Sequence, residues 1–219
     1  MIAPALSHTP PLGHAALTPL YDAAIALLTN ERRWRRALVD EICAGAHNEI
    51  IDVGSGTGSL AALLAKAAPA SRYVGVDPDA QAVGIARRKA AQSGANATFV
   101  HGFFAEAAPD AKADVVVSSL VLHQVPLDEK RRIIAAAFES LKSGGRILIA
   151  DYGRQGSKLS KVLFRATVQA LDGVENTQPN ADGVLPVIMT QSGFSAVNER
   201  HRFVSLTGEI CIYRGERAV

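Results

Sequence analysis

The chain has 219 residues, which fits one α/β domain with modest additions. Hydrophobic residues make up 48% of it and charged residues 20%, so a sizeable core is expected. The 23 basic residues nearly balance the 21 acidic ones, which argues against a nucleic-acid-binding protein, where a basic face is expected. No apolar run approaches the roughly 18 to 20 residues that span a bilayer, so we expect no stable membrane insertion.

The beginning of the chain and the two cysteines favour a cytoplasmic protein. The segment MIAPALSHTPPLGHAAL lacks a basic start and is interrupted by prolines, which is not typical of a signal peptide. Cys43 and Cys211 lie far apart and form no CxxC pair. Reduced packing residues are therefore the favoured interpretation, with a disulfide as the alternative.

Residues 1–45 are predicted to form an irregular arm and helices that cover the site. Prolines and a glycine make 1–17 irregular. A first helix begins near Pro19, and a second is expected over 31–44, where large apolar residues recur at i, i+4 and i+8. The arginines of ERRWRR are interpreted as a solvated helix face, and a patch for an anionic substrate is the alternative.

From residue 46 onward the chain alternates between short apolar strands and helices. This alternation predicts a mostly parallel sheet with helices on both faces, joined by right-handed crossovers. Strands are expected at 49–53, 73–77, 97–102, 113–120 and 146–151, and the helices between them end near Ala67, Gly94 and residue 142.

The last third of the chain adds a cap and a hairpin to this domain, which we place at 46–219. Residues 154–183 are predicted to be a cap insertion that starts with a helix over 158–171 and ends in a polar, turn-rich stretch. LPVIMTQSGF predicts a further helix, and the tail predicts an antiparallel hairpin that turns at 207–208.

The glycine-rich segment IIDVGSGTGSL follows the first strand and precedes a helix. Glycines at 54, 56 and 58 allow a tight turn and let a ligand approach the main chain. The end of a strand at this position is also the ligand crevice of open α/β sheets. A purely structural turn is the alternative. A dinucleotide site is a second one, but its GxGxxG fingerprint needs a glycine where this chain has Ser59.

Asp77 ends the next strand, roughly 20 residues beyond the glycine loop. A carboxylate at this place accepts hydrogen bonds from both hydroxyls of an adenosine ribose. The alternative is a helix N-cap, since Asp77 precedes Pro78, although Asp79 is an equally good capping residue.

Five motifs in this order resemble those of the class I S-adenosylmethionine-dependent methyltransferases. They are DVGSGTG, VGVDPD, ADVVVSSLVLHQV, LKSGGRILIADYG and SGFSAV, and within the family they are most similar to the ubiquinone/menaquinone methyltransferase-like branch. The resemblance covers about residues 18–215. It implies a Rossmann-like α/β fold with a seven-stranded, mostly parallel sheet and a C-terminal antiparallel hairpin, S-adenosyl-L-methionine as cofactor, and a small-molecule methyl acceptor.

The resemblance also implies roles for individual residues. Asp52 is expected to buttress the glycine loop, Asp77 to take the ribose and Pro78 to lie beside the adenine. The loop residues expected to line the methionine part of the cofactor are Gly54, Ser55, Gly56 and Gly58.

The segment after the third strand departs from the family pattern. Many relatives carry a Gly-Asp pair there, whose carboxylate receives the adenine amino group, whereas this chain has HGFF. We expect Phe103 or Phe104, or both, to wall the adenine by stacking. A backbone or water partner for the amine is one alternative, and a role in the core is the other.

The segment SSLVLHQV after the fourth strand is where the family's substrate and cofactor meet. Ser119 and Leu120 are expected to approach the methionine end. His123 is a candidate general base near neutral pH, with a structural hydrogen-bonding role as the alternative. Tyr21 and Asp151 are further catalytic candidates; Tyr21 either closes over the cofactor or packs the N-terminal helix.

The cap is expected to hold a small, partly apolar acceptor, such as an aromatic or quinone-like ring. Its apolar residues and amides support this, although a helix that merely covers the sheet is the alternative. The sequence contains no metal-spaced cysteine set, and it leaves the acceptor, the methylated atom and the oligomeric state open. Two rival functions are a non-catalytic S-adenosylmethionine- or S-adenosylhomocysteine-binding domain and a nicotinamide-dependent oxidoreductase.

Overall fold

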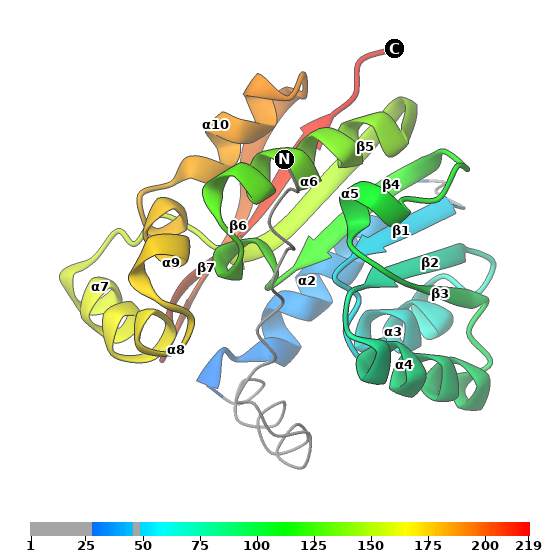
Figure 1. Ribbon diagram of the computed structural model, residues 1–219, viewed down its shortest axis with the longest axis horizontal. Coiled ribbons are helices and arrows are strands. Elements are labelled where there is room, and N and C mark those ends of the chain that lie inside the picture. Colours follow the sequence, from blue (N-terminus) through cyan, green and yellow to red (C-terminus); the bar gives the residue numbers. More distant parts are fainter. Residues whose placement is uncertain (1–27, 46–48) are drawn as a thin grey trace, which may run out of the picture.

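A computed structural model describes residues 28–45 and 49–219 of the chain (Figure 1). Within these residues, seven strands form one sheet. They are β1 (Glu49–Val53), β2 (Arg72–Asp77), β3 (Ala97–His101), β4 (Ala113–Ser119), β5 (Leu141–Tyr152), β6 (Ser195–Ser205) and β7 (Gly208–Glu216). Their order is β3-β2-β1-β4-β5-β7-β6; β1 to β5 pair in parallel, and β7 is antiparallel to β5 and β6. The predicted sheet and hairpin are confirmed.

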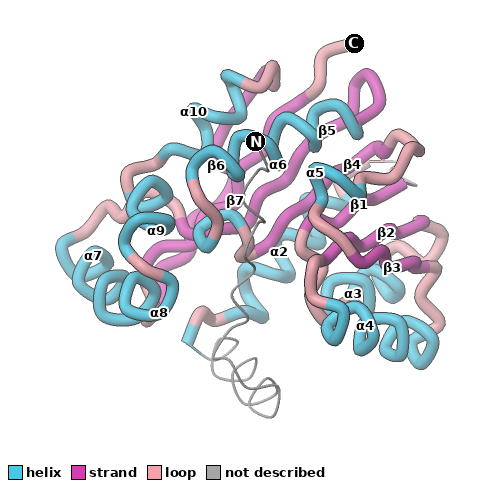
Figure 2. Tube along the Cα trace, in the orientation of Figure 1, coloured by secondary structure: helices cyan, strands magenta, loops and turns pink. Residues whose placement is uncertain are grey.

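Helices cover both faces of this sheet (Figures 1 and 2). One face carries α2 (Glu31–Cys43), α3 (Ser59–Ala67) and α4 (Ala80–Ser93). The other carries α5 (Phe104–Ala107), α6 (Leu127–Ser140) and α10 (Val184–Gln191). Side chains alternate between the faces along each strand, so Ile50 and Val115 pack under the first layer, and Ile51 and Val116 under the second.

The cap segment 158–183 forms a separate cluster of short helices beside β7 (Figure 1). It begins with α7 (Lys158–Phe164), continues through a π-helical turn over Arg165–Gln169, and ends with α8 (Ala170–Asp172) and α9 (Val174–Ala181). The helix predicted over 158–171 is confirmed.

The polar end of the cap was expected to be irregular, and that prediction is wrong. Residues 174–181 form α9 even though the helix contains Pro179. Thr177 and Asn180 are completely buried, and Asn180 Nδ2 donates to the carbonyl of Tyr152 at 3.1 Å. Tertiary contacts thus override the weak helix propensity of Asn, Thr and Pro here.

The N-terminal region is described only from residue 28, so Tyr21 and the helix expected near Pro19 lie outside the described residues. Trp34 and Leu38 of α2 are completely buried on the sheet. Cys43 and Cys211 are free thiols, as the favoured interpretation predicted. In the part of the chain that the structure describes, no helix has both the length and the apolar character needed to cross a bilayer.

Candidate functional site

The carboxyl ends of the parallel strands meet at one edge of the sheet, and the glycine loop joins β1 to α3 there. Gly54, Gly56 and Gly58 all have left-handed backbone conformations, with φ of 70°, 52° and 75°. Residues other than glycine adopt these backbone angles only with strain. The loop therefore requires glycine at every second position, which explains the GxGxG spacing.

The three glycines have different surroundings. These show which glycines are needed for packing and which one leaves space for a ligand. A Cβ on Gly54 would collide with Val121, and one on Gly58 would lie 2.9 Å from Ala86. Among the described residues, and apart from its two chain neighbours, a Cβ on Gly56 would meet nothing within 4 Å. Gly54 and Gly58 are thus needed for close packing, whereas Gly56 faces open space beside the loop.

Asp77 lies at the edge of this open space. Its side chain is 8% exposed, and it accepts hydrogen bonds from the backbone N–H of Gly56 at 2.7 Å and of Asp79 at 2.8 Å. The helix N-cap is Asp79, whose carboxylate accepts from the N–H groups of Gln81 and Ala82. The capping role considered for Asp77 therefore belongs to Asp79, and Asp77 is joined to the glycine loop.

Asp52 does not hold the loop as expected. Its carboxylate is 1% exposed and accepts a hydrogen bond from the Tyr73 hydroxyl. Burial raises the pKa of Asp52 to about 7, against the opposing effects of the Tyr73 hydrogen bond and the Arg35 charge. The loop is held instead by Asp77 and by the carbonyl of Val76, which accepts from the N–H groups of residues 54 and 55.

Ser55 and Phe104, two further residues expected to contact the cofactor, are also buried in the protein. The Ser55 side chain is buried against the sheet, where a Cβ on Gly75 would approach its Oγ to 2.6 Å, so it does not face the open side of the loop. Phe104 is 5% exposed and belongs to the core beneath α6. Phe103, half-buried at the start of α5, remains the candidate for the adenine wall.

Strand β4 ends in a strained backbone next to the glycine loop. Ser119 and Leu120 are half-buried, and Leu120 has φ of 55°, a conformation rare for residues other than glycine. The Leu120 N–H donates to the carbonyl of Ala150, and its carbonyl accepts from Gln124 Nε2. Such strain is held in place by surrounding contacts and is concentrated at functional sites.

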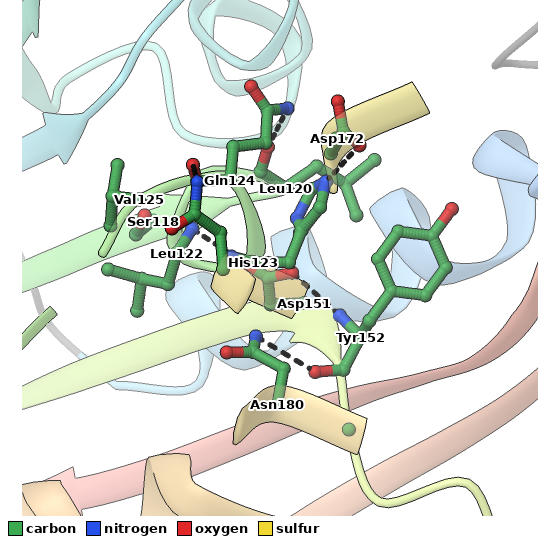
Figure 3. Close-up of polar contacts among 12 residues, drawn as sticks. Ser118, Leu120, Leu122, His123, Gln124, Val125, Asp151, Tyr152, Asp172 and Asn180 are labelled. Carbon is green, nitrogen blue, oxygen red and sulfur yellow. Dashed lines mark hydrogen bonds and ion pairs between the residues drawn. The ribbon is translucent and has the colours of Figure 1, made fainter. Parts of the chain in front are cut away.

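A 3₁₀ turn over Leu122–Gln124 follows, and Asp151 fixes it from β5 (Figure 3). The Asp151 carboxylate is fully buried and accepts from the N–H groups of Leu122, His123 and Tyr152. Its Oδ1 also lies 2.7 Å from His123 Nδ1. Asp151 therefore holds the turn, and its role as a catalytic residue stays a prediction.

His123 lies between two carboxylates. Its ring is 3% exposed; Nδ1 faces Asp151, and Nε2 lies 3.5 Å from Oδ2 of Asp172 in the cap. The edge of the ring contacts the Tyr152 ring. Burial alone would lower the pKa of His123, but the charges and hydrogen bonds of Asp151 and Asp172 raise it to about 9. The pKa of His123 therefore lies above its ordinary value of 6.5, and its role as a general base stays a prediction.

Lys130 is a buried residue of the site that the sequence analysis missed. Its ammonium, on α6, donates to the carbonyls of Leu122 at 2.5 Å, Val125 at 2.6 Å and Asn176 at 2.8 Å. Burial lowers the pKa of Lys130 to about 8, against the effect of the Asp151 charge. A signal was present, because Lys130 lies three and four residues before Ile133 and Ile134 on the buried face of α6.

The sequence matches a methyltransferase domain model over residues 50–145. It is 32% identical to a demethylmenaquinone methyltransferase of Thermus thermophilus over 62% of each chain. It is 28% identical to a ubiquinone/menaquinone biosynthesis C-methyltransferase of Syntrophotalea carbinolica, covering 93% of this chain and 92% of that one. An uncharacterized methyltransferase of Bacillus pumilus is 30% identical, over 72% of this chain and 74% of that one. The chain belongs to the class I S-adenosylmethionine-dependent methyltransferases.

Solved structures agree on the fold. An O-methyltransferase family protein from Burkholderia thailandensis has a TM-score of 0.68 at 18% identity, covering 91% of this chain and 59% of that one. PigF with SAH has a TM-score of 0.62 at 20% identity, covering 81% of this chain and 53% of that one. The chain thus spans little more than half the length of these two proteins. S-adenosylmethionine is its cofactor, and the open, glycine-lined edge beside Gly56 fits that group.

Proposed function

We propose that this methyltransferase acts on a small, partly apolar acceptor, such as an aromatic or quinone-like ring. The observation that carries the proposal is the pairing of an open glycine loop at Gly56 with a separate cap at 158–183, both next to the turn after β4. Two relatives are named for demethylmenaquinone or for ubiquinone/menaquinone biosynthesis, which supports a quinone-like acceptor.

The cofactor-facing part of the proposal assigns the open side of the loop to the methionine part of the cofactor. Gly56 leaves room for it, Asp77 accepts from the ribose, and Phe103 and Pro78 border the adenine. When bound, S-adenosylmethionine supplies a methyl group on a sulfonium. The chain's own part is to align the acceptor and exclude water, and alignment alone contributes on the order of 7–11 kcal/mol in favourable intramolecular reactions.

The cap contributes apolar surface to the proposed acceptor side. Leu171 and Val174 are 62% and 58% exposed and flank Asp172 in sequence. Phe164, by contrast, is 1% exposed and packs in the core, so for this residue the alternative of covering the sheet holds. The acceptor contacts are therefore placed at the α8–α9 end of the cap.

A screen of candidate acceptors with radiolabelled S-adenosylmethionine tests the proposal. Transfer of label to aromatic or quinone-like compounds, and not to proteins or nucleic acids, is the expected result. Tight binding of both S-adenosylmethionine and S-adenosylhomocysteine without transfer to any acceptor would favour a non-catalytic binding domain. Calorimetric binding of a nicotinamide dinucleotide in place of these two compounds would favour an oxidoreductase.

Asp77→Ala should weaken S-adenosylmethionine binding at least about tenfold, because hydrogen bonds to a charged acceptor are each worth roughly 1.5–3 kcal/mol. Isothermal titration calorimetry measures the change. Asp79→Ala is the matched control: it removes the carboxylate that caps α4, costs about 1 kcal/mol of stability, and should leave the affinity unchanged. Equal affinities for Asp77→Ala and the wild type would remove Asp77 from the ribose site.

A further inference from the structure

The cap meets the turn after β4 through polar contacts on two sides (Figure 3). On one side, Lys130 binds the carbonyl of Asn176, and Asn176 Nδ2 donates to the carbonyl of Gln124 at 3.0 Å. On the other side, the cap reaches the same turn through Asp172 and His123. The contacts of Lys130 and Asn176 end on backbone carbonyls, whereas Asp172 and His123 are two ionisable side chains, so this contact depends on their charges.

The two halves of the Asp151–His123–Asp172 chain differ in strength. The inner half joins His123 Nδ1 to a carboxylate that is 1% exposed, at 2.7 Å. The outer half joins Nε2 to a carboxylate that is 23% exposed, at 3.5 Å. A longer contact that is open to solvent is weaker, since water screens the charge. The contact with Asp172 is therefore the weaker half of the chain.

The geometry also favours a charged ring. A neutral imidazole has one donor and one acceptor nitrogen, whereas an imidazolium has two donors. Each nitrogen of His123 faces a carboxylate oxygen, and a carboxylate only accepts. Only the imidazolium satisfies both. Among the described residues, the ionisable groups that face His123 or its turn are Asp151 and Tyr152 from β5, Asp172 from α8 and Lys130 from α6.

We propose that Asp172 is a positioning residue whose ion pair with His123 latches the cap 158–183 onto the turn after β4. The proposal rests on the proposed function, in that this turn is taken as the edge of methyl transfer. The latch opens and closes at the α8 end of the cap, while Lys130 and Asn176 keep the α9 end attached.

Asp172→Asn tests the latch without a known acceptor. Removing the charge should accelerate amide hydrogen exchange across residues 170–177 about tenfold, as expected when a local opening becomes easier. It should also lower the pKa of His123, followed by NMR of ring-labelled histidine with the His123 signal assigned by its loss in His123→Gln. Glu175→Gln, an equal charge change at an exposed cap residue, is the matched control and should alter neither quantity. Asp172→Glu should restore both.

Two results overturn the latch. One is equal exchange over 170–177 in Asp172→Asn and Glu175→Gln; the other is a lowered pKa of His123 without faster exchange. If Asp172→Asn fails to fold, the wild type still decides. Its exchange over 170–173, corrected for the intrinsic rate, should rise as the pH passes about 9, and a constant corrected rate there overturns the latch. Residues 174–177 are left out of this comparison because Lys130, which binds the carbonyl of Asn176, loses its charge near pH 8. The acceptor screen with radiolabelled S-adenosylmethionine is run alongside, because failure to methylate any aromatic or quinone-like compound with an intact latch would contradict the proposed function alone.

Discussion

Gly56→Val should abolish detectable S-adenosylmethionine binding, with a loss of affinity of at least about a hundredfold, equivalent to roughly 2.7 kcal/mol. Valine at this position projects into the open space beside the loop, where its Cβ meets no atom within 4 Å in the described part of the chain beyond its two neighbours. The protein therefore has room for the valine side chain. A cofactor bound beside Gly56, as proposed, would collide with it. Calorimetry on the folded variant measures the loss.

Valine is also disfavoured at the φ of 52° found at Gly56. The effect of this backbone strain has to be separated from the effect of a side chain that occupies the space of the cofactor. Gly94 offers a matched control. It ends α4 in the same left-handed region, with φ of 66° and nothing within 4 Å of its Cβ position, and it lies outside the site. Gly94→Val should lower the free energy of unfolding but leave the affinity unchanged. Equal affinities for the wild type and Gly56→Val would show that the loop is only a turn.

The fold could be predicted from the sequence because its signals are local. Strands such as EIIDV are short apolar runs, α4 ends at Gly94, and the GxGxG spacing matches three left-handed residues. The turn-rich end of the cap could not be predicted. Its helix α9 depends on burial of Thr177 and Asn180 against segments distant in sequence, and a propensity argument does not see such contacts.

The sequence predicted the site residues that lie at the ends of strands. It did not predict the contacts that join residues of different elements. Asp77 lies where the loop spacing placed it, at the tip of β2 and bonded to Gly56. The pairing of His123 with Asp151 could not be predicted, because the sequence places them 28 residues apart and does not show that they form a buried pair. Asp172, which faces the other ring nitrogen, comes from the cap, and no periodicity connects it to β4.

The stability of the wild type should fall as the pH rises from about 6.5 to about 9 because of His123. The pKa of His123 is raised in the folded protein from 6.5 to about 9. Its contribution is therefore complete below pH 6.5, where the ring is charged in both states, and is lost as the folded protein releases the proton. A change of this size corresponds to roughly 3 kcal/mol for a buried group.

Two other buried groups titrate near the same pH range. Their contributions to the free energy of unfolding have to be subtracted to obtain that of His123. The pKa of Asp52 is raised from 3.8 to about 7, so its ionisation lowers stability between those values. The pKa of Lys130 is lowered from 10.5 to about 8, so stability gains from it above pH 8. Both groups are present in His123→Gln, and the difference in unfolding free energy between the wild type and this variant isolates the histidine.

Urea denaturation of both proteins at pH 6, 7, 8 and 9.5 measures that difference. We expect the advantage of the wild type over His123→Gln to shrink by roughly 3 kcal/mol across the series, with most of the loss above pH 7. In the background of Asp172→Asn the loss should be smaller and centred at a lower pH, because one of the two carboxylates that hold the proton has become neutral. Glu175→Gln should reproduce the wild-type curve. A difference that stays constant from pH 6 to 9.5 would mean that the pKa of His123 is the same in the folded and unfolded protein, and the carboxylates of Asp151 and Asp172 would then not stabilise the charged ring.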